Sequence, residues 1–157
     1  MIETVLGLDR KESENLADNL NGLLSNFQIY YQNLRGLHWN IKGKNFFELH
    51  NKFEELYTDA QVKIDEIAER ILTLHGKPLH TFTDYVNNSS VPVGKNISND
   101  VESVELVVNS LSKLLEIERE ILDLSDKAND EGTNAMMSDL IAEQEKVIWM
   151  LNSWLGK

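Results

Sequence analysis

The stretch FFELHNKFEELYTDAQVKIDEIAERILTL, residues 46–74, decides the fold class. Its apolar residues recur at steps of four and three, the spacing that places side chains in one stripe along a helix. The stripe consists of Leu49, Phe53, Leu56, Ala60, Ile64, Ile67, Ile71 and Leu74. No proline interrupts the stretch, which therefore predicts one long amphipathic helix.

Three further segments show the same periodicity, over residues 16–37, 104–124 and 137–154. Both prolines, Pro78 and Pro92, lie between the second and third of the four segments, so each segment is free to form a long helix. No comparable stretch alternates with the period of two that is typical of a strand. The sequence predicts an all-α fold.

The boundaries of these helices have their own markers. We expect Asn45 and Asn99 to cap the second and third long helices, because each is followed three residues later by a glutamate. Gly76, just ahead of Pro78, is expected to end the second helix, and Gly132 to separate the last two.

The connection over residues 77–98 is long enough to run from one end of a helix bundle to the other, and residues 83–88 are expected to form a short helix within it. We therefore predict an up-down-down-up four-helix bundle with one crossover, as in ferritin-like folds. A chain of 157 residues suits a single domain, over residues 1–157.

Composition narrows the possible functions. The chain has 15 Lys and Arg against 26 Asp and Glu, a formal net charge of −11, and no cysteine. Thiol chemistry is excluded, and the acidic excess argues against binding to nucleic acid or to anionic membranes. The first ten residues lack the pattern of a secretory signal, and the longest apolar run, residues 147–151, is too short to cross a bilayer. We expect a cytoplasmic protein that binds cations.

Imidazole and carboxylate groups gather in the first half of the chain. His38, His50, Asp65 and Glu69 are the candidate ligands, with Glu54 one helical turn after His50. This combination suits a first-row divalent metal such as iron, manganese or zinc.

Spacing along the second helix decides how these residues meet. His50 and Asp65 are fifteen positions apart, about 22 Å along a helix, so one chain cannot bring both to one ion. An antiparallel pairing of this helix with its copy, centred between Tyr57 and Thr58, places His50 of one chain beside Asp65 of the other. A hairpin near residues 43–44 makes His38 a neighbour of His50. The chain also has no Glu-x-x-His pair of the kind that di-iron four-helix bundles use within one subunit. The spacing predicts two metal sites per dimer, each shared between two subunits.

The run LHWNIKGKNFFELH from residue 37, followed by IDEIAERI from residue 64, resembles the Dps family of mini-ferritins. The segment EKVIWML, residues 145–151, resembles the fourth helix of that family. The resemblance implies that His38 and His50 bind metal with Asp65 and Glu69 of a second subunit. It also implies a hollow dodecamer that oxidises Fe(II), preferably with hydrogen peroxide and otherwise with oxygen, and stores the ferric product, protecting the cell against oxidative stress.

The resemblance extends to further residues. The family often has Asp where this chain has Glu54, so the second, weaker iron position differs from the usual one. Glu54 and Glu55 are expected to face the cavity and nucleate mineral, and Asp123, Asp126 and Asp130 to line three-fold pores that draw cations inward. Trp39 and Trp149 resemble aromatic residues near the family's metal site. Packing is the simpler role for these two residues, and interception of stray oxidising equivalents is the alternative.

Other interpretations compete with this one. The chain could compact DNA, as the family name suggests, although only Arg10 and Lys11 are basic among the first 34 residues and the C-terminus has no basic extension. It could also be a shell that binds metal without turnover. His75 and His80 are expected to be ordinary surface histidines. The stripe from Asp123 to Asp130 could equally be an ordinary solvated face.

Overall fold

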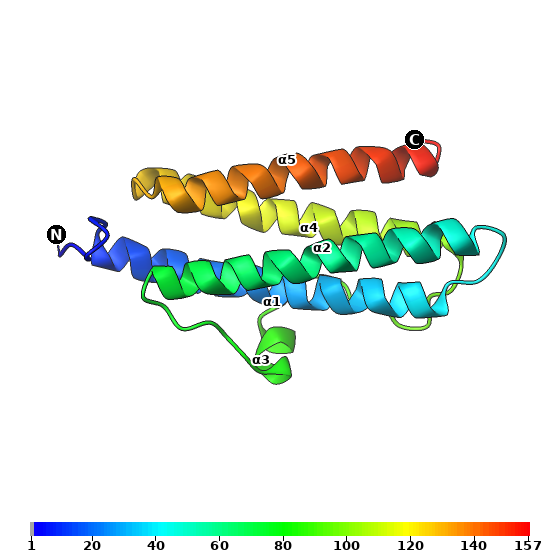
Figure 1. Ribbon diagram of the computed structural model, residues 1–157, viewed down its shortest axis with the longest axis horizontal. Coiled ribbons are helices and arrows are strands. Elements are labelled where there is room, and N and C mark those ends of the chain that lie inside the picture. The colour runs from blue at the N-terminus through cyan, green and yellow to red at the C-terminus, as the bar shows by residue number, and fades with distance from the viewer. Residues whose placement is uncertain (1) are drawn as a thin grey trace.

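The computed structural model describes residues 2–157, which form four long helices and one short one (Figure 1). They are α1 (Arg10–Asn40), α2 (Phe46–Thr73), α3 (Phe82–Asn87), α4 (Asp100–Lys127) and α5 (Glu131–Trp154). The described residues contain no strand beyond an isolated bridge between Glu3 and Asp9. The all-α prediction is therefore confirmed. Among these helices, none has an apolar stretch long enough to span a bilayer.

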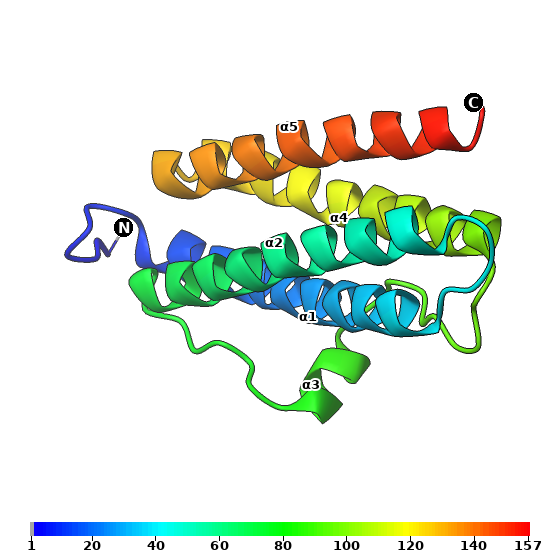
Figure 2. The same cartoon turned by 45° about the vertical axis from the view of Figure 1, so that its right-hand side comes forward.

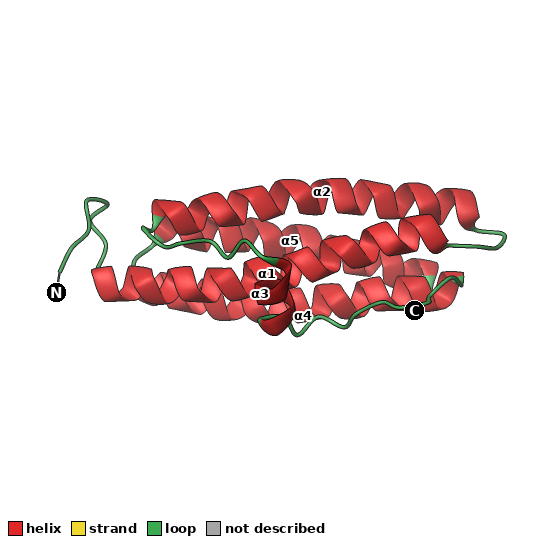
Figure 3. Cartoon of the chain, turned by 90° about the horizontal axis from the view of Figure 1, so that it is seen from below, coloured by secondary structure: helices red, strands yellow, loops and turns green. Residues whose placement is uncertain are grey.

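The long helices form two antiparallel hairpins, α1 with α2 and α4 with α5, which pack against each other through α1 and α4. Because α2 and α4 run in the same direction, the chain must return along the full length of the bundle between them, as Figures 1 and 2 show. Helix α3 lies within this return and packs against α1 (Figure 3). The up-down-down-up order with one crossover is as predicted from the sequence.

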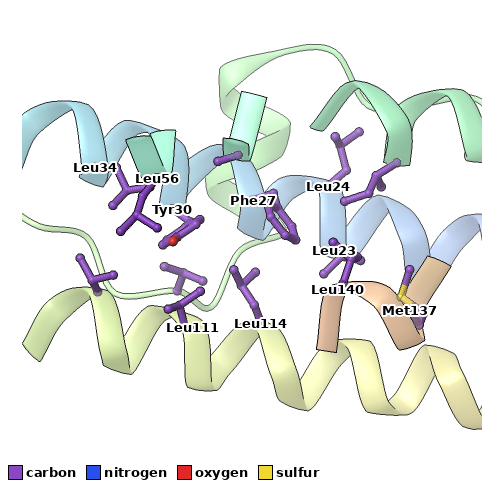
Figure 4. Close-up of a cluster of buried hydrophobic side chains, with 14 of the residues drawn as sticks. Leu23, Leu24, Phe27, Tyr30, Leu34, Leu56, Leu111, Leu114, Met137 and Leu140 are labelled. Carbon is purple, nitrogen blue, oxygen red and sulfur yellow. The ribbon is translucent and has the colours of Figure 1, made fainter. Parts of the chain in front are cut away.

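The core of the bundle is built from the predicted stripes. Phe27 and Tyr30 of α1 meet edge to face, with ring centroids 6.1 Å apart, near the middle of the bundle. Around them Figure 4 shows buried leucines from α1, α2, α4 and α5. Burying each such side chain favours folding by about 1.5–3 kcal/mol, so these stripes supply the main driving force for the bundle.

Three asparagines of α1 hold the crossover against the bundle. Asn21 Oδ1 accepts from the Leu79 N–H at 2.8 Å, and Asn26 Oδ1 accepts from the Val91 N–H at 3.0 Å. Asn33 donates to the Pro92 carbonyl at 2.7 Å. These asparagine side chains supply hydrogen-bond partners for backbone groups of the crossover that no helix or sheet pairs. Their hydrogen bonds hold the crossover along α1.

The helix caps follow the sequence only in part. Asn99 caps α4 as predicted, with Oδ1 accepting from the Glu102 N–H at 2.8 Å. Asn45 occupies the predicted N-cap position of α2, but its side chain makes no capping bond: its backbone is not extended and its amide donates to Asp100 Oδ2 at 2.7 Å. This bond ties the α1–α2 hairpin to the start of α4. Asp9 caps α1, which the sequence analysis did not predict.

Gly76 is in close contact with α1 just after the end of α2. Residue His75, at φ 65°, carries the left-handed turn after α2, and the Gly76 N–H closes it by donating to the Ile71 carbonyl at 2.9 Å. Gly76 is needed because a Cβ there would lie 2.6 Å from the Ala17 Cβ.

The prediction that Gly132 separates the last two helices is wrong, since Gly132 lies inside the first turn of α5. Asn129, at φ 57°, makes the turn between α4 and α5.

Candidate metal centre

His38 and His50 stack against each other at one end of the α1–α2 hairpin. Their ring centroids are 3.8 Å apart and their planes differ by 11°. The residues between α1 and α2 reverse the chain about a point midway between the two histidines, which places them at the same height. The prediction that the hairpin makes them neighbours is confirmed.

The two imidazoles are locked by a reciprocal pair of hydrogen bonds. His38 Nδ1 lies 2.7 Å from the His50 carbonyl oxygen, and His50 Nδ1 lies 2.7 Å from the His38 carbonyl oxygen. A carbonyl oxygen can only accept, so each Nδ1 carries the proton and donates. In the neutral ring the Nε2 lone pair is then free to bind a metal, and the carbonyl fixes the orientation of the ring.

Aromatic neighbours restrict both rings further. Phe46 stacks on His50 with centroids 4.8 Å apart, and Tyr57 meets His38 edge to face at 5.4 Å. The Tyr57 hydroxyl donates to Glu54 Oε1 at 3.5 Å. Loss of hydration, followed by the Glu54 carboxylate, raises the pKa of the Tyr57 phenol, so it stays protonated at neutral pH. Both aromatics lie within seven residues of His50 in the sequence, a proximity that could have marked them.

Asp65 and Glu69 lie elsewhere on α2. Both are exposed, and neither has a cationic partner within 4.0 Å among residues 2–157. Asp65 borders a shallow surface hollow of about 640 Å³, together with Thr58 and the half-exposed Val62. The oxygens of these two carboxylates are therefore free to bind a cation from outside the chain.

The histidine pair, His38 and His50, and the carboxylate pair, Asp65 and Glu69, are therefore separate within one chain. Each pair is one half-set of the predicted metal ligands. In the described part of the chain no three His, Asp or Glu side chains lie close enough to hold one ion. Fifteen residues at 3.6 per turn also put His50 and Asp65 within about 60° of each other around α2. His50 and Asp65 thus lie toward one side of α2, equally far from a midpoint between Tyr57 and Thr58, while His38 is buried beside His50 on α1.

The remaining sequence-predicted residues lie as follows. Glu54 and Glu55 are exposed on α2, and Glu55 is near Lys52 at 3.4 Å. Trp39 and Trp149 are 57% and 64% exposed, so packing within one chain does not explain them. Instead Trp39 stacks with Arg35, whose guanidinium carbon is 4.9 Å from the ring centroid.

The acidic stripe near the α4–α5 turn is not uniform. Asp123 and Asp126 are exposed, and Asp123 pairs with Lys127 at 2.7 Å. Asp130 is 2% exposed, pairs with Arg70 at 2.7 Å and caps α5. The structure therefore does not bring the Asp130 carboxylate to the surface with the other two.

The two remaining histidines lie away from this hairpin end. His75 is exposed in the turn after α2, and His80 Nδ1 lies 3.1 Å from the Pro78 carbonyl oxygen. Neither belongs to a group of three potential ligands within residues 2–157.

The sequence matches the family described as "Ferritin-like domain" over residues 17–157. It is 39% identical, over 98% of this chain and 96% of the relative, to the "DNA protection during starvation protein" of Porphyromonas gingivalis. A crystal structure of a Dps protein from Vibrio cholerae O1 superimposes with a TM-score of 0.96 and 51% identity, covering 99% of this chain and 98% of that one. It is described as a member of a broad superfamily of ferritin-like diiron-carboxylate proteins.

A crystal structure from Listeria innocua is of a Dps mutant in which two histidines, twelve positions apart, are replaced by glycine. It superimposes with a TM-score of 0.87 and 30% identity, and covers 90% of this chain and 95% of that one. His38 and His50 have the same spacing in this sequence.

Proposed function

Since this chain belongs to the Dps family of ferritin-like proteins, we propose that it is a ferroxidase and iron store whose catalytic centres lie between paired subunits. His38 and His50 of one subunit bind Fe(II) together with Asp65 and Glu69 of the other. The reciprocal hydrogen bonds between the two histidines carry this proposal, because they leave both Nε2 atoms free for a metal.

The donor set suits iron as the substrate. Two neutral imidazoles and two carboxylates are ligands that Fe(II) accepts, and a site with few protein ligands keeps coordination positions open for an oxidant. Hydrogen peroxide is the preferred oxidant in this proposal, and oxygen the alternative. Two Fe(II) ions, one peroxide and two protons give two Fe(III) ions and two waters. No hydroxyl radical is released, because the two electrons arrive together.

The pairing of two chains through α2 follows from the same residues. A two-fold axis near Tyr57 and Thr58 brings each histidine pair to the carboxylate pair of the partner and yields two sites per dimer. We propose that such dimers assemble into a hollow dodecamer that stores the ferric product. The exposed carboxylates of Glu54 and Glu55 then serve to nucleate mineral, and Glu54 is a candidate ligand of a second iron. In the cytoplasm this activity protects against oxidative stress.

Stopped-flow measurement of Fe(II) oxidation tests the proposal. The H38A/H50A variant should lose most of the peroxide-dependent rate while keeping its assembly mass in light scattering. The H75A/H80A variant removes two histidines outside the proposed site and should keep the rate of the unmodified protein. Equal rates for all three proteins would show that the shell binds metal without turnover at this site.

A further inference from the structure

A carboxyl group lies in the interior of the bundle, away from the proposed metal centre. Glu118 of α4 is fully buried, with 0% of its surface exposed, and faces Gln144 of α5, which is 7% exposed. Gln144 Nε2 donates to Glu118 Oε2 at 2.7 Å. This bond connects α4 and α5 through two buried polar side chains.

The other two oxygens of this pair have no hydrogen-bond partner. They are Glu118 Oε1 and Gln144 Oε1, one on each side of the same contact. A carboxylate oxygen and an amide oxygen are both acceptors, so neither can satisfy the other. Buried polar atoms are nearly always paired, because an unpaired one costs about 1–3 kcal/mol. A single proton on Glu118 Oε1 supplies the missing donor.

We propose that Glu118 and Gln144 form a buried proton-binding site. Glu118 is then a carboxylic acid whose Oε1 hydroxyl donates to Gln144 Oε1, while Gln144 Nε2 donates to Glu118 Oε2. The two side chains make a cyclic acid–amide pair in which all four polar atoms are satisfied. The site is independent of the proposed ferroxidase centre.

The charged groups on the surrounding helices do not compensate an ionised Glu118. Arg119, the nearest cation on α4, is directed to Glu145 at 2.8 Å, and Lys63 of α2 pairs with Glu143 of α5 at 3.1 Å. Tyr30 of α1 contributes a buried phenol, whose pKa is raised by burial and then by the charges of Asp59 of α2 and of Glu118. Burial raises the pKa of Glu118 to about 8, against the smaller opposing effects of Gln144 and Arg119.

Such a site makes stability depend on pH. The unfolded chain loses this proton near pH 4.3, whereas the folded chain keeps it to about pH 8. The contribution of Glu118 to stability is fully present below the unfolded pKa and declines as pH rises toward the folded pKa. Above it, Glu118 Oε1 and Gln144 Oε1 are both buried acceptors without a donor. We therefore expect the contact between these helices to loosen in alkaline solution.

Infrared spectroscopy of the intact protein tests the proposal. At pH 7 exposed carboxyl groups are ionised, so a carboxylic-acid C=O band at that pH reports a buried protonated group. The unmodified protein should show the band and lose it with a midpoint near pH 8. The E118Q variant should lack it at pH 7 and above, and the matched E120Q variant, which changes an exposed glutamate on the same helix, should retain it at pH 7.

The Q144L variant tests the pairing and guards against misfolding of E118Q. Because Gln144 donates to Glu118 Oε2 and, in the proposed pair, accepts from the Oε1 hydroxyl, its removal should change the midpoint of the band. The proposal is overturned if the unmodified protein has no carboxylic-acid band at pH 7, if E118Q keeps the band, or if Q144L leaves the midpoint unchanged. It is also overturned if protein dialysed against a chelator retains a stoichiometric metal ion that E118Q lacks.

Discussion

His38 and His50 each donate an Nδ1 proton to the backbone carbonyl of the other, and this reciprocity sets the direction in which both rings can bind. The ring orientation does not depend on a bound metal, because the carbonyls and the Phe46 and Tyr57 rings already fix it. In the proposed shared site, the metal would therefore bind these two rings with little rearrangement.

A second residue-scale contact, between Arg70 and Asp130, supports the far end of α2. The guanidinium donates to Asp130 Oδ1 at 2.7 Å and to Thr133 Oγ1 at 2.9 Å. Asp130 is 2% exposed, so water does not replace this partner. The contact explains why Asp130 differs from the exposed Asp123 and Asp126.

We predict that R70M lowers the free energy of unfolding by about 3 kcal/mol, because it leaves a buried carboxylate without its cation. Urea unfolding of the assembled protein measures the change. The matched K127M variant removes the exposed partner of Asp123 and should change the value by less than about 0.5 kcal/mol. A loss for R70M no larger than that for K127M would contradict this account of Asp130.

At the scale of elements, the packing of α2 against α1 depends on a close contact just after the end of α2. Gly76 follows α2 where the chain passes against α1, and Ala17 leaves no room for a further methyl group there. This contact sets how closely the last turn of α2 approaches the first half of α1.

We predict that G76A costs about 1–3 kcal/mol of unfolding free energy, because the added Cβ would lie 2.6 Å from the Ala17 Cβ and 2.9 Å from Ile71 Cγ2. Chemical denaturation measures it. G22A, within α1 where an added Cβ meets nothing within 4 Å, should instead gain about 0.5–1 kcal/mol. If both variants change stability by the same amount, steric contact at Gly76 is not the reason for the glycine.

The helices themselves were predictable, because their stripes arise from the burial that also stabilises them. The errors fall at boundaries. Asn45 has the sequence of a cap, yet Asp100, 55 positions later, takes its amide, and Gly132 lies beside Arg70, a partner far away in the sequence. Local pattern carries no information about such partners. The reciprocal hydrogen bonds between His38 and His50 were missed for the same reason, although the proximity of the two residues followed from the hairpin.

At the scale of the whole molecule, charge decides which partners can approach. The chain carries a net charge of −11, and the copies in the proposed shell would multiply it. Cations are attracted by such a surface and polyphosphates are repelled.

We predict that D123N/D126N slows Fe(II) uptake at low ionic strength, because two exposed carboxylates near the α4–α5 turn no longer attract the ion. The initial rate of Fe(II) oxidation, measured with and without added salt, reports the effect. E105Q/E116Q removes the same charge elsewhere on α4 and should leave the rate unchanged. Equal slowing by both pairs would assign the effect to net charge rather than to a pore.

We also predict no retardation of duplex DNA in a gel shift at low salt without divalent ions. Counterion release from DNA requires clustered positive charge, and the chain has only Arg10 and Lys11 near its N-terminus. Tight binding under these conditions would favour a DNA-compacting role.

The central claim, that each metal site is completed by two chains, is tested most directly by mixing two inactive variants. H38A/H50A lacks one half-set of ligands and D65A lacks part of the other, so each alone should have little peroxide-dependent Fe(II) oxidation. Mixed pairs, obtained by co-expression with two different tags, hold one complete site, made from the histidines of one chain and the carboxylates of its partner. We predict that mixed assemblies recover activity that neither parent has. Activity no higher than that of the parents, in assemblies shown to contain both chains, would contradict the shared site.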